Sequence, residues 1–181
     1  MLESLIFITE KWDGRIKARM CANSSKQRKW MQKEDSSSPT TSIEALFIQS
    51  TINAKEKQDN ITLDISNAFI QTKHTSKTIH MKIRGELVDI LVSIDPTTYE
   101  DYVTYENGKK VLYVELLKAI YGTLEAALLF YKKLRKDLEN EGYRVNKYDP
   151  CVANKIIQRK QHTIVCHVDN LMASHVDAQV N

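Results

Sequence analysis

Three turn signals, each between two apolar segments, constrain the fold of this chain most. They are Asp13-Gly14, Asn107-Gly108 and Asp169-Asn170. Gly, Asn and Asp tolerate the left-handed backbone conformation that tight hairpin turns need. The sequence therefore predicts three antiparallel hairpins, whose strands, in chain order, are Leu5–Ile8 and Ile16–Cys21, Tyr102–Tyr105 and Val111–Leu116, and Thr163–Val168 and Leu171–Val176.

Two other segments have the apolar spacing of helices. After a Ser- and Pro-rich stretch, Thr41 and Glu44 have the spacing of a capping box, which predicts a helix from there. A second helix is expected from Leu124 to Asn140, with Gly142 as its stop. Short strands are expected at Ile61–Ile65 and Thr78–Ile83. Because strands and helices do not alternate regularly, the sequence predicts an α+β fold.

The composition is that of a globular protein with an uneven charge. Hydrophobic residues make up 42% of the chain and charged residues 27%, which excludes a disordered chain. Residues 1–33 hold eight Lys and Arg against three acidic residues, whereas the whole chain has a net charge of +3. This basic arm suits a polyanionic partner, although a solvated charged surface explains the same balance.

Neither secretion nor membrane insertion is indicated. The three cysteines, Cys21, Cys151 and Cys166, are scattered and odd in number, which favours a reducing compartment over a disulfide framework. No apolar run approaches the roughly 20 residues that span a bilayer, and the N-terminus lacks the basic start of a signal peptide. We therefore expect an intracellular protein, in the cytoplasm or the nucleus, with no membrane partner.

Two aspartates are the main candidates for chemistry. Asp64 lies on the polar face of the strand expected at Ile61–Ile65, and Asp169 stands at a hairpin tip. If this hairpin packs next to that strand, the two carboxylates converge at one edge of a sheet, where they can bind Mg²⁺ or Mn²⁺. Two such metals catalyse phosphoryl transfer. Taken singly, each aspartate is explained by an exposed strand position or by ordinary turn chemistry.

Other residues carry weaker signals. Phe69 suits core packing, and Gly122 allows a close backbone approach or simply marks the turn before a helix. His162, His167 and His175 cluster near the last hairpin but lack the spacing of a zinc site. The sequence contains no glycine-rich phosphate loop and no recognisable nucleophile with its base.

Five short blocks match one family in the same order. They are Asp13–Arg19, which leads into Lys-Ala-Arg; Leu63–Ile70, with Asp64 shortly before Ala-Phe; Leu117–Gly122, with Lys-Ala and Tyr-Gly; Tyr148–Val152, with Asp-Pro-Cys-Val; and His167–Asn170. In these blocks, which are spread over nearly its whole length, the chain resembles the reverse transcriptase of copia-type LTR retrotransposons.

The resemblance implies a right-hand polymerase fold with fingers and palm, in which an antiparallel palm sheet packs on helices and the thumb is absent. Residues 1–60 would be mainly fingers, and residues 61–181 would be fingers and palm. The implied activity is RNA-directed DNA polymerisation by two-metal nucleotidyl transfer. Its cofactor would be Mg²⁺ or Mn²⁺, and its partners would be an RNA or DNA template–primer and a dNTP.

For the catalytic centre, the resemblance implies that Asp64 and Asp169 hold the metals between the nucleotide phosphates and the primer 3′-hydroxyl. Asn170 stands where the family has a second Asp, so one negative charge is lost beside the metals. A neutral amide binds Mg²⁺ more weakly than a carboxylate. We therefore expect these three residues to form a weakened catalytic site. His167 also departs from the family, which has Tyr there.

For the nucleotide pocket, the resemblance implies five binding residues: Lys17, Arg19, Phe69, Tyr121 and Gly122. Lys17 and Arg19 would contact the triphosphate or the template backbone, and Phe69 would exclude a 2′-hydroxyl. The block after Gly122 reads Thr-Leu-Glu-Ala-Ala instead of the usual Leu-Lys-Gln-Ala-Pro. In the fingers, Gln27 is kept from the family's Arg-Gly-x-x-Gln, whereas the Arg and Gly are lost.

The leading hypothesis is a truncated, weakly active or inactive reverse transcriptase domain, because Asn170 and the missing thumb both remove parts that the reaction needs. One alternative is a non-catalytic nucleic-acid-binding module that uses the basic residues 11–33. Another is a decayed retrotransposon-derived protein with marginal folding. The sequence leaves the oligomeric state open.

Overall fold

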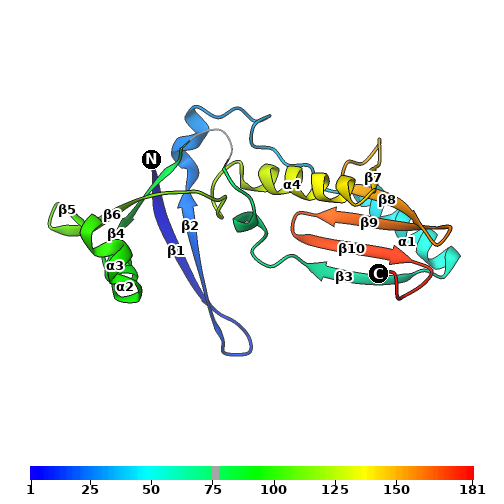
Figure 1. The fold of residues 1–181 in the computed structure, drawn as a ribbon, viewed down its shortest axis with the longest axis horizontal. Coiled ribbons are helices and arrows are strands. Elements are labelled where there is room, and N and C mark those ends of the chain that lie inside the picture. Colours follow the sequence, from blue (N-terminus) through cyan, green and yellow to red (C-terminus); the bar gives the residue numbers. More distant parts are fainter. Residues whose placement is uncertain (75–77) are drawn as a thin grey trace. The chain divides into compact units, whose positions relative to one another are not determined.

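The computed structural model describes residues 1–74 and 78–181 and divides them into two compact units (Figure 1). The first unit comprises Met1–Ser36 and Phe69–Ala126, and the second comprises Ser37–Ala68 and Ala127–Asn181. Each unit contains one five-stranded sheet. The chain is therefore α+β, as the sequence predicts. The boundary between polymerase subdomains expected near residue 60 stays a prediction.

The first unit is built on a sheet with the strand order β2-β1-β4-β6-β5. Its strands are β1 (Leu2–Glu10), β2 (Ile16–Asn23), β4 (His80–Arg84), β5 (Thr104–Glu106) and β6 (Lys109–Glu115). The hairpins β1–β2 and β5–β6 confirm two of the predicted hairpins. The second one turns at Asn107 and Gly108, whose φ angles of 48° and 75° fit a type I′ turn.

Short helices complete this unit. They are η1 (Ser24–Lys29), η2 (Ala68–Gln71, starting at the unit boundary), α2 (Glu86–Ile94), α3 (Pro96–Tyr99) and η3 (Glu100–Tyr102). The core brings together Leu2 of β1, Met81 of β4, Leu112 of β6 and Val88 of α2. The sequence signals do not mark α2, because a short run of Leu, Ile and Val suits a buried strand as well as a helix.

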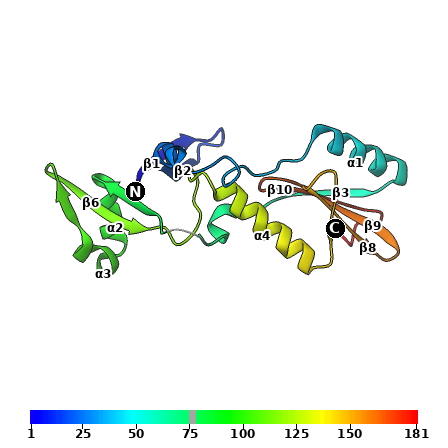
Figure 2. The ribbon, with the colours of Figure 1, turned by 90° about the horizontal axis from the view of Figure 1, so that it is seen from above.

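The second unit contains the sheet β3-β10-β9-β8-β7, which is antiparallel throughout. Its strands are β3 (Asp59–Asp64), β7 (Arg144–Val145), β8 (Val152–Ile157), β9 (Lys160–His167) and β10 (Asn170–His175). Figures 1 and 2 show α1 (Ile43–Glu56) and α4 (Ala126–Asn140) alongside it. Both predicted helices and the third hairpin are therefore present.

The start of α1 differs from the predicted capping box of Thr41 and Glu44. The cap is Ser42, whose side chain accepts a hydrogen bond from the backbone N–H three residues later. The Asp149 carboxylate accepts from the Ser42 backbone (2.9 Å) and from the Thr41 hydroxyl (3.3 Å). Burial opposes ionisation of Asp149, but hydrogen bonds from Ser42, Cys151 and Thr41 outweigh it and lower its pKa. Thr41 thus anchors α1 through Asp149 instead of capping it.

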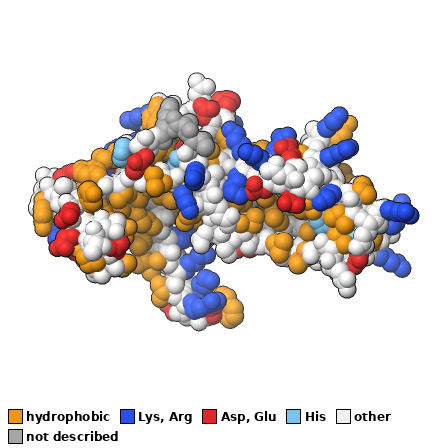
Figure 3. Space-filling view, viewed as in Figure 1, with side chains coloured by type: hydrophobic (Ala, Val, Ile, Leu, Met, Phe, Trp, Pro, Cys, Tyr) orange, Lys and Arg blue, Asp and Glu red, His pale blue; other side chains and the backbone are white. Residues whose placement is uncertain are grey.

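Both units leave large apolar side chains exposed, as Figure 3 shows for one face. In the β1–β2 hairpin, Phe7 is 54% exposed and Trp12 is 97% exposed. In the second unit, Phe47 of α1 is 68% exposed. In the described residues, no helix has the length and apolar character to cross a membrane.

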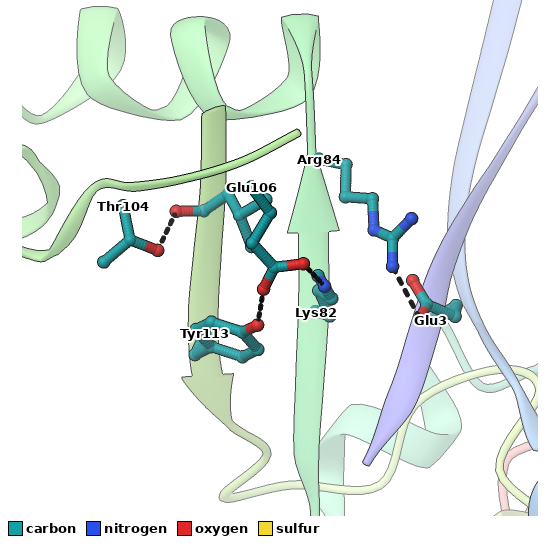
Figure 4. A network of polar contacts seen from close by, with 7 residues as sticks. Glu3, Lys82, Arg84, Thr104, Glu106 and Tyr113 are labelled. Carbon is teal, nitrogen blue, oxygen red and sulfur yellow. Dashed lines mark hydrogen bonds and ion pairs between the residues drawn. The ribbon is translucent and has the colours of Figure 1, made fainter. Parts of the chain in front are cut away.

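A polar network ties β4 to the β5–β6 hairpin in the first unit (Figure 4). Lys82, which is 4% exposed, pairs with Glu106, and Glu106 also accepts a hydrogen bond from the Tyr113 hydroxyl. The hydrogen bond between Lys82 and Glu106 raises the pKa of the amine and lowers the pKa of the carboxyl. On the neighbouring strand pair, Arg84 binds Glu3 of β1 at 3.1 Å. These contacts reinforce the order β1-β4-β6.

Two histidines are buried in the second unit. His162 is 3% exposed, and its ring centroid lies 6.0 Å from that of His175, which is fully buried. The Nδ1 of His162 lies 2.8 Å from the Tyr143 hydroxyl. Burial, followed by the charge of His175 and that of Lys155, lowers the pKa of His162, against the effect of a hydrogen bond to Asn181. His162 is therefore a core residue that resists protonation.

We expect the free energy of unfolding to fall as the pH decreases below 6.5, the ordinary pKa of histidine. The unfolded chain takes up a proton at His162 there, whereas the folded chain does so only at lower pH, so acid favours unfolding. Urea titrations between pH 7.5 and 5 measure this slope. His162→Gln is expected to reduce it, and an unchanged slope in the variant would contradict the assignment.

Candidate functional site

Strand register brings the predicted catalytic residues to one end of the second unit's sheet. Asp64, the last residue of β3, lies directly opposite Asn170, the first residue of β10. The backbone N–H of Ile65 donates to the carbonyl of Asp169 at 2.8 Å, which extends the pairing beyond the strand ends. The hairpin therefore packs beside the strand of Asp64, as the sequence analysis anticipates.

The oxygen atoms of these side chains are suitable ligands for a hard cation, but too few acidic residues are grouped here to hold one alone. Asp64 and Asn170 are exposed and Asp169 is half-buried. Across residues 1–74 and 78–181, no group of three or more His, Cys, Asp and Glu is arranged to hold a metal. Two carboxylates and an amide oxygen supply the oxygen donors that Mg²⁺ prefers, and water or phosphate would complete its shell.

Asn170 interacts with its neighbour directly. Its Nδ2 donates to the Oδ1 of Asp169 at 3.4 Å, a long hydrogen bond. An amide N–H directed at a carboxylate competes with a cation for the same oxygen. Asn170 therefore disfavours cation binding at Asp169 in two ways, since its side chain carries no charge and engages the Asp169 carboxylate.

The turn of this hairpin is displaced by one residue from the prediction. β9 ends at His167, which pairs with Asn170, so the turn residues are Val168 and Asp169 and not Asp169-Asn170. Val168 has a φ of 57° and Asp169 is not in the positive-φ region, the pattern of a type II′ turn, where glycine is usual. A β-branched residue in this region is strained, so the ladder pairing overrides local turn preference.

In the first unit, three predicted nucleotide-binding residues form a stack. The Arg19 guanidinium of β2 lies 5.4 Å from the centroid of the Tyr121 ring. The Phe69 ring of η2 lies on Tyr121 with centroids 4.7 Å apart and planes tilted by 56°. Lys17 is two residues before Arg19 on β2 and is exposed, so it projects from the same strand face. Arg19 and Phe69 therefore both contact the ring of Tyr121.

Gly122 lets this segment dock on β2. The backbone N–H of Ala22 donates to the carbonyl of Tyr121 at 2.8 Å. Gly122 has a φ of 89°, and a Cβ at this position would lie 2.1 Å from the Ala22 carbonyl oxygen. Both the backbone conformation and the close approach therefore require glycine, and the position does more than mark a helix turn.

Two residues discussed in the sequence comparison, Glu125 and Gln27, have structural partners that sequence spacing does not reveal. Glu125, in place of the usual Gln, lies 2.7 Å from Nδ1 of His74, and both side chains are largely buried. Gln27, which the chain keeps, is fully buried, and its Oε1 accepts from the Leu124 backbone at 3.1 Å. Gln27 and Glu125 thus hold the segment around Tyr121 within the first unit.

No family model, curated protein or solved structure matches this chain. The second unit holds the oxygen donors of Asp64, Asp169 and Asn170, which suit a cation. The first unit separately holds the contacts of Arg19 and Phe69 with Tyr121, which suit an anionic, aromatic ligand.

We expect Val168→Gly to stabilise the second unit by about 1 kcal/mol. Relief of positive-φ strain is worth about 1–3 kcal/mol, and the greater flexibility of glycine in the unfolded chain offsets part of it. Chemical denaturation compares it with Val168→Ala, which keeps a Cβ and thus the strain. Equal stability of the two variants would contradict a strained turn.

Gly122→Ala should destabilise the first unit more than Gly108→Ala does, by about 1–3 kcal/mol. Both glycines have a positive φ, but only a Cβ at Gly122 meets backbone atoms, because Gly108 has nothing within 4 Å of that position. The comparison therefore separates the steric cost from the conformational cost. Equal losses in thermal unfolding would mean that the approach to Ala22 is not tight.

Proposed function

We propose that this chain is the fingers-and-palm part of a copia-type reverse transcriptase whose catalytic centre is weakened. The observation that carries the proposal is the register of β3 on β10, which sets Asp64 opposite Asn170 and beside Asp169. The sequence motifs predict this convergence from blocks about a hundred residues apart. A chance resemblance does not require the two blocks to meet at one sheet end.

In this proposal, Asp64 and Asp169 hold Mg²⁺ or Mn²⁺ through their carboxylate oxygens. The bound ions would lower the pKa of the attacking hydroxyl and neutralise charge on the transferred phosphate. Asp64 is exposed at the end of β3 and open to a nucleotide phosphate. Asn170 supplies an amide where a carboxylate is needed, so metal affinity and phosphoryl transfer are both reduced.

The stack in the first unit would bind the nucleotide. Arg19 is permanently charged and offers several N–H donors to a phosphate. The Tyr121 ring holds the guanidinium by a cation–π contact. Phe69 contacts the same Tyr121 ring, and its bulk would exclude a ribose 2′-hydroxyl. Lys17, exposed on the same strand, would add a second phosphate contact.

A second candidate function is nucleic-acid binding without catalysis. The observation that favours it is the β1–β2 hairpin, where the exposed Trp12 and Phe7 lie among basic residues such as Lys11 and Lys17. Cationic and aromatic side chains together bind single strands. Binding that falls steeply with salt but ignores Mg²⁺ and Asp64→Ala would favour this function over polymerisation.

We expect Asn170→Asp to tighten Mn²⁺ binding about tenfold, because a carboxylate replaces an amide at the metal. Isothermal titration of Mn²⁺ into the whole chain measures this directly. Primer extension on an RNA template, with Mg²⁺ or Mn²⁺, should rise in the same variant from weak or undetectable incorporation. Asp64→Ala should abolish both metal binding and any extension.

Asp59→Asn is the matched control, since Asp59 begins β3 at the opposite end of the strand. It should leave Mn²⁺ affinity unchanged. Equal Mn²⁺ affinity in the wild type and Asp64→Ala would overturn the metal site. Robust, Asp64-dependent extension by the unaltered chain would instead overturn the claim that Asn170 impairs the enzyme.

A further inference from the structure

A cavity of about 670 Å³ lies in the second unit, at the β7–β8 end of the sheet. Arg144 of β7, Lys147 of the following loop and Lys155 of β8 line it, together with Tyr148. Lys155 pairs with His162 on β9, which is about 20 Å along that strand from the turn of Asp169 at the strand spacing of 3.3 Å per residue. The cavity is therefore separate from the proposed metal site.

The cavity has an unbalanced positive charge. No Asp or Glu is among the residues that line it. In the part of the chain that the structure describes, Arg144, Lys147 and Lys155 are in no ion pair, whereas cations such as Lys133 and Arg135 of α4 pair with acids one helical turn away. Figure 3 shows Lys and Arg side chains over α4 and the β7–β8 end. Lys155 instead lies 5.4 Å from the centroid of the Tyr143 ring. Three cations without acidic partners around one hollow attract an anion.

The polar groups of the wall add hydrogen-bond donors. The Oδ1 of Asn146 accepts from the backbone N–H of Tyr148 at 2.8 Å, and the Oδ1 of Asn154 accepts from the Thr163 hydroxyl at 2.9 Å. Each amide oxygen is thus engaged, which leaves the Nδ2 group of each residue as its donor. Both residues line the cavity, so its neutral polar groups also favour an anionic ligand.

The cavity also contains an aromatic surface. Tyr148 is 98% exposed, and Ile156, another lining residue, is 67% exposed. Both side chains therefore offer apolar surface that a ligand in the cavity could cover. The hydrogen bond from the Tyr148 backbone N–H to Asn146 positions the backbone of this residue, and its exposed side chain lines the same cavity as the cations. A ligand that fits this wall carries flat apolar groups as well as negative charge.

We propose that this cavity binds a single-stranded nucleic acid, with its phosphates on Arg144, Lys147 and Lys155 and an unpaired base on Tyr148. The three cations come from a strand, a loop and a second strand, which suits successive phosphates of a chain better than one isolated phosphate. Base–aromatic stacking beside a cationic groove is the usual way in which proteins bind single strands. The site does not depend on polymerase activity or on bound metal.

The test is binding of fluorescein-labelled U12 and dT12 to the whole chain, followed by fluorescence anisotropy at several salt concentrations. Arg144→Gln with Lys155→Gln should lower the slope of log K against log salt by about 1.4, since each phosphate contact to a single strand contributes about 0.7. Lys132→Gln with Lys136→Gln is the matched control. These two exposed lysines of α4 also belong to no ion pair among the described residues.

Tyr148→Ala should weaken binding about tenfold, and Tyr148→Phe should keep it. Ultraviolet crosslinking of 4-thiouridine-labelled RNA, mapped by mass spectrometry, should mark Tyr148 and separates this site from the β1–β2 hairpin. Comparable affinity for U12 and dT12 indicates backbone and base contacts shared by both, whereas preference for U12 indicates use of the 2′-hydroxyl; both support the site.

Three results would overturn the proposal. The first is equal salt slopes for the Arg144/Lys155 and Lys132/Lys136 double variants. The second is a crosslink pattern without Tyr148. The third is displacement of the oligonucleotide by a phosphopeptide or inorganic polyphosphate, provided that Tyr148→Ala leaves the affinity of this competitor unchanged. The cavity would then be an anion site without base recognition. Loss of Mn²⁺ binding alone would affect only the polymerase proposal.

Discussion

The pairing of β3 with β10 is the constraint on which the rest of the second unit depends. A shift of one residue would turn every side chain of β3 to the other face and separate Asp64 from Asn170. A polar network around the buried Ser174 and Asn53 holds the register at the opposite end, where Ser174 donates to its partner Asn60 at 2.8 Å and the Asn53 amide of α1 contacts both. Because Ser174 and Asn53 are shielded from water, a slipped register would leave their polar groups unpaired.

The same ladder explains why some turns follow from the sequence and one does not. Asn107-Gly108 turns where its local chemistry predicts, because both residues take positive φ without strain. At the β9–β10 hairpin, Asp169-Asn170 is the better local turn, yet the pairing of Asn170 with both His167 and Asp64 makes it a strand residue. Val168 must then occupy the strained position. Long-range pairing outweighs local preference there.

The candidate sites also differ in whether local sequence predicts them. The aspartates and Phe69 are predictable because short motifs contain them, and the helices α1 and α4 because their periodicity is local. The cavity around Arg144, Lys147 and Lys155 is not, since Lys155 lines the same cavity as the other two cations only when β7 pairs with β8. The pair of Glu125 with His74 likewise depends on a tertiary contact. Neither the cavity nor this pair can therefore be predicted from the spacing of residues in the sequence.

Asn170 links stability to function at the hairpin tip. With Asp at this position, a carboxylate would stand beside Asp169 and opposite Asp64, and like charges so close disfavour the folded hairpin unless a metal neutralises them. The amide removes that repulsion and donates to Asp169. The exchange therefore favours folding without metal at the expense of metal affinity, the usual opposition between stability and an active site's needs. With Asn at position 170, the hairpin folds without a bound cation, and under the proposed function it would bind that cation less tightly than with Asp.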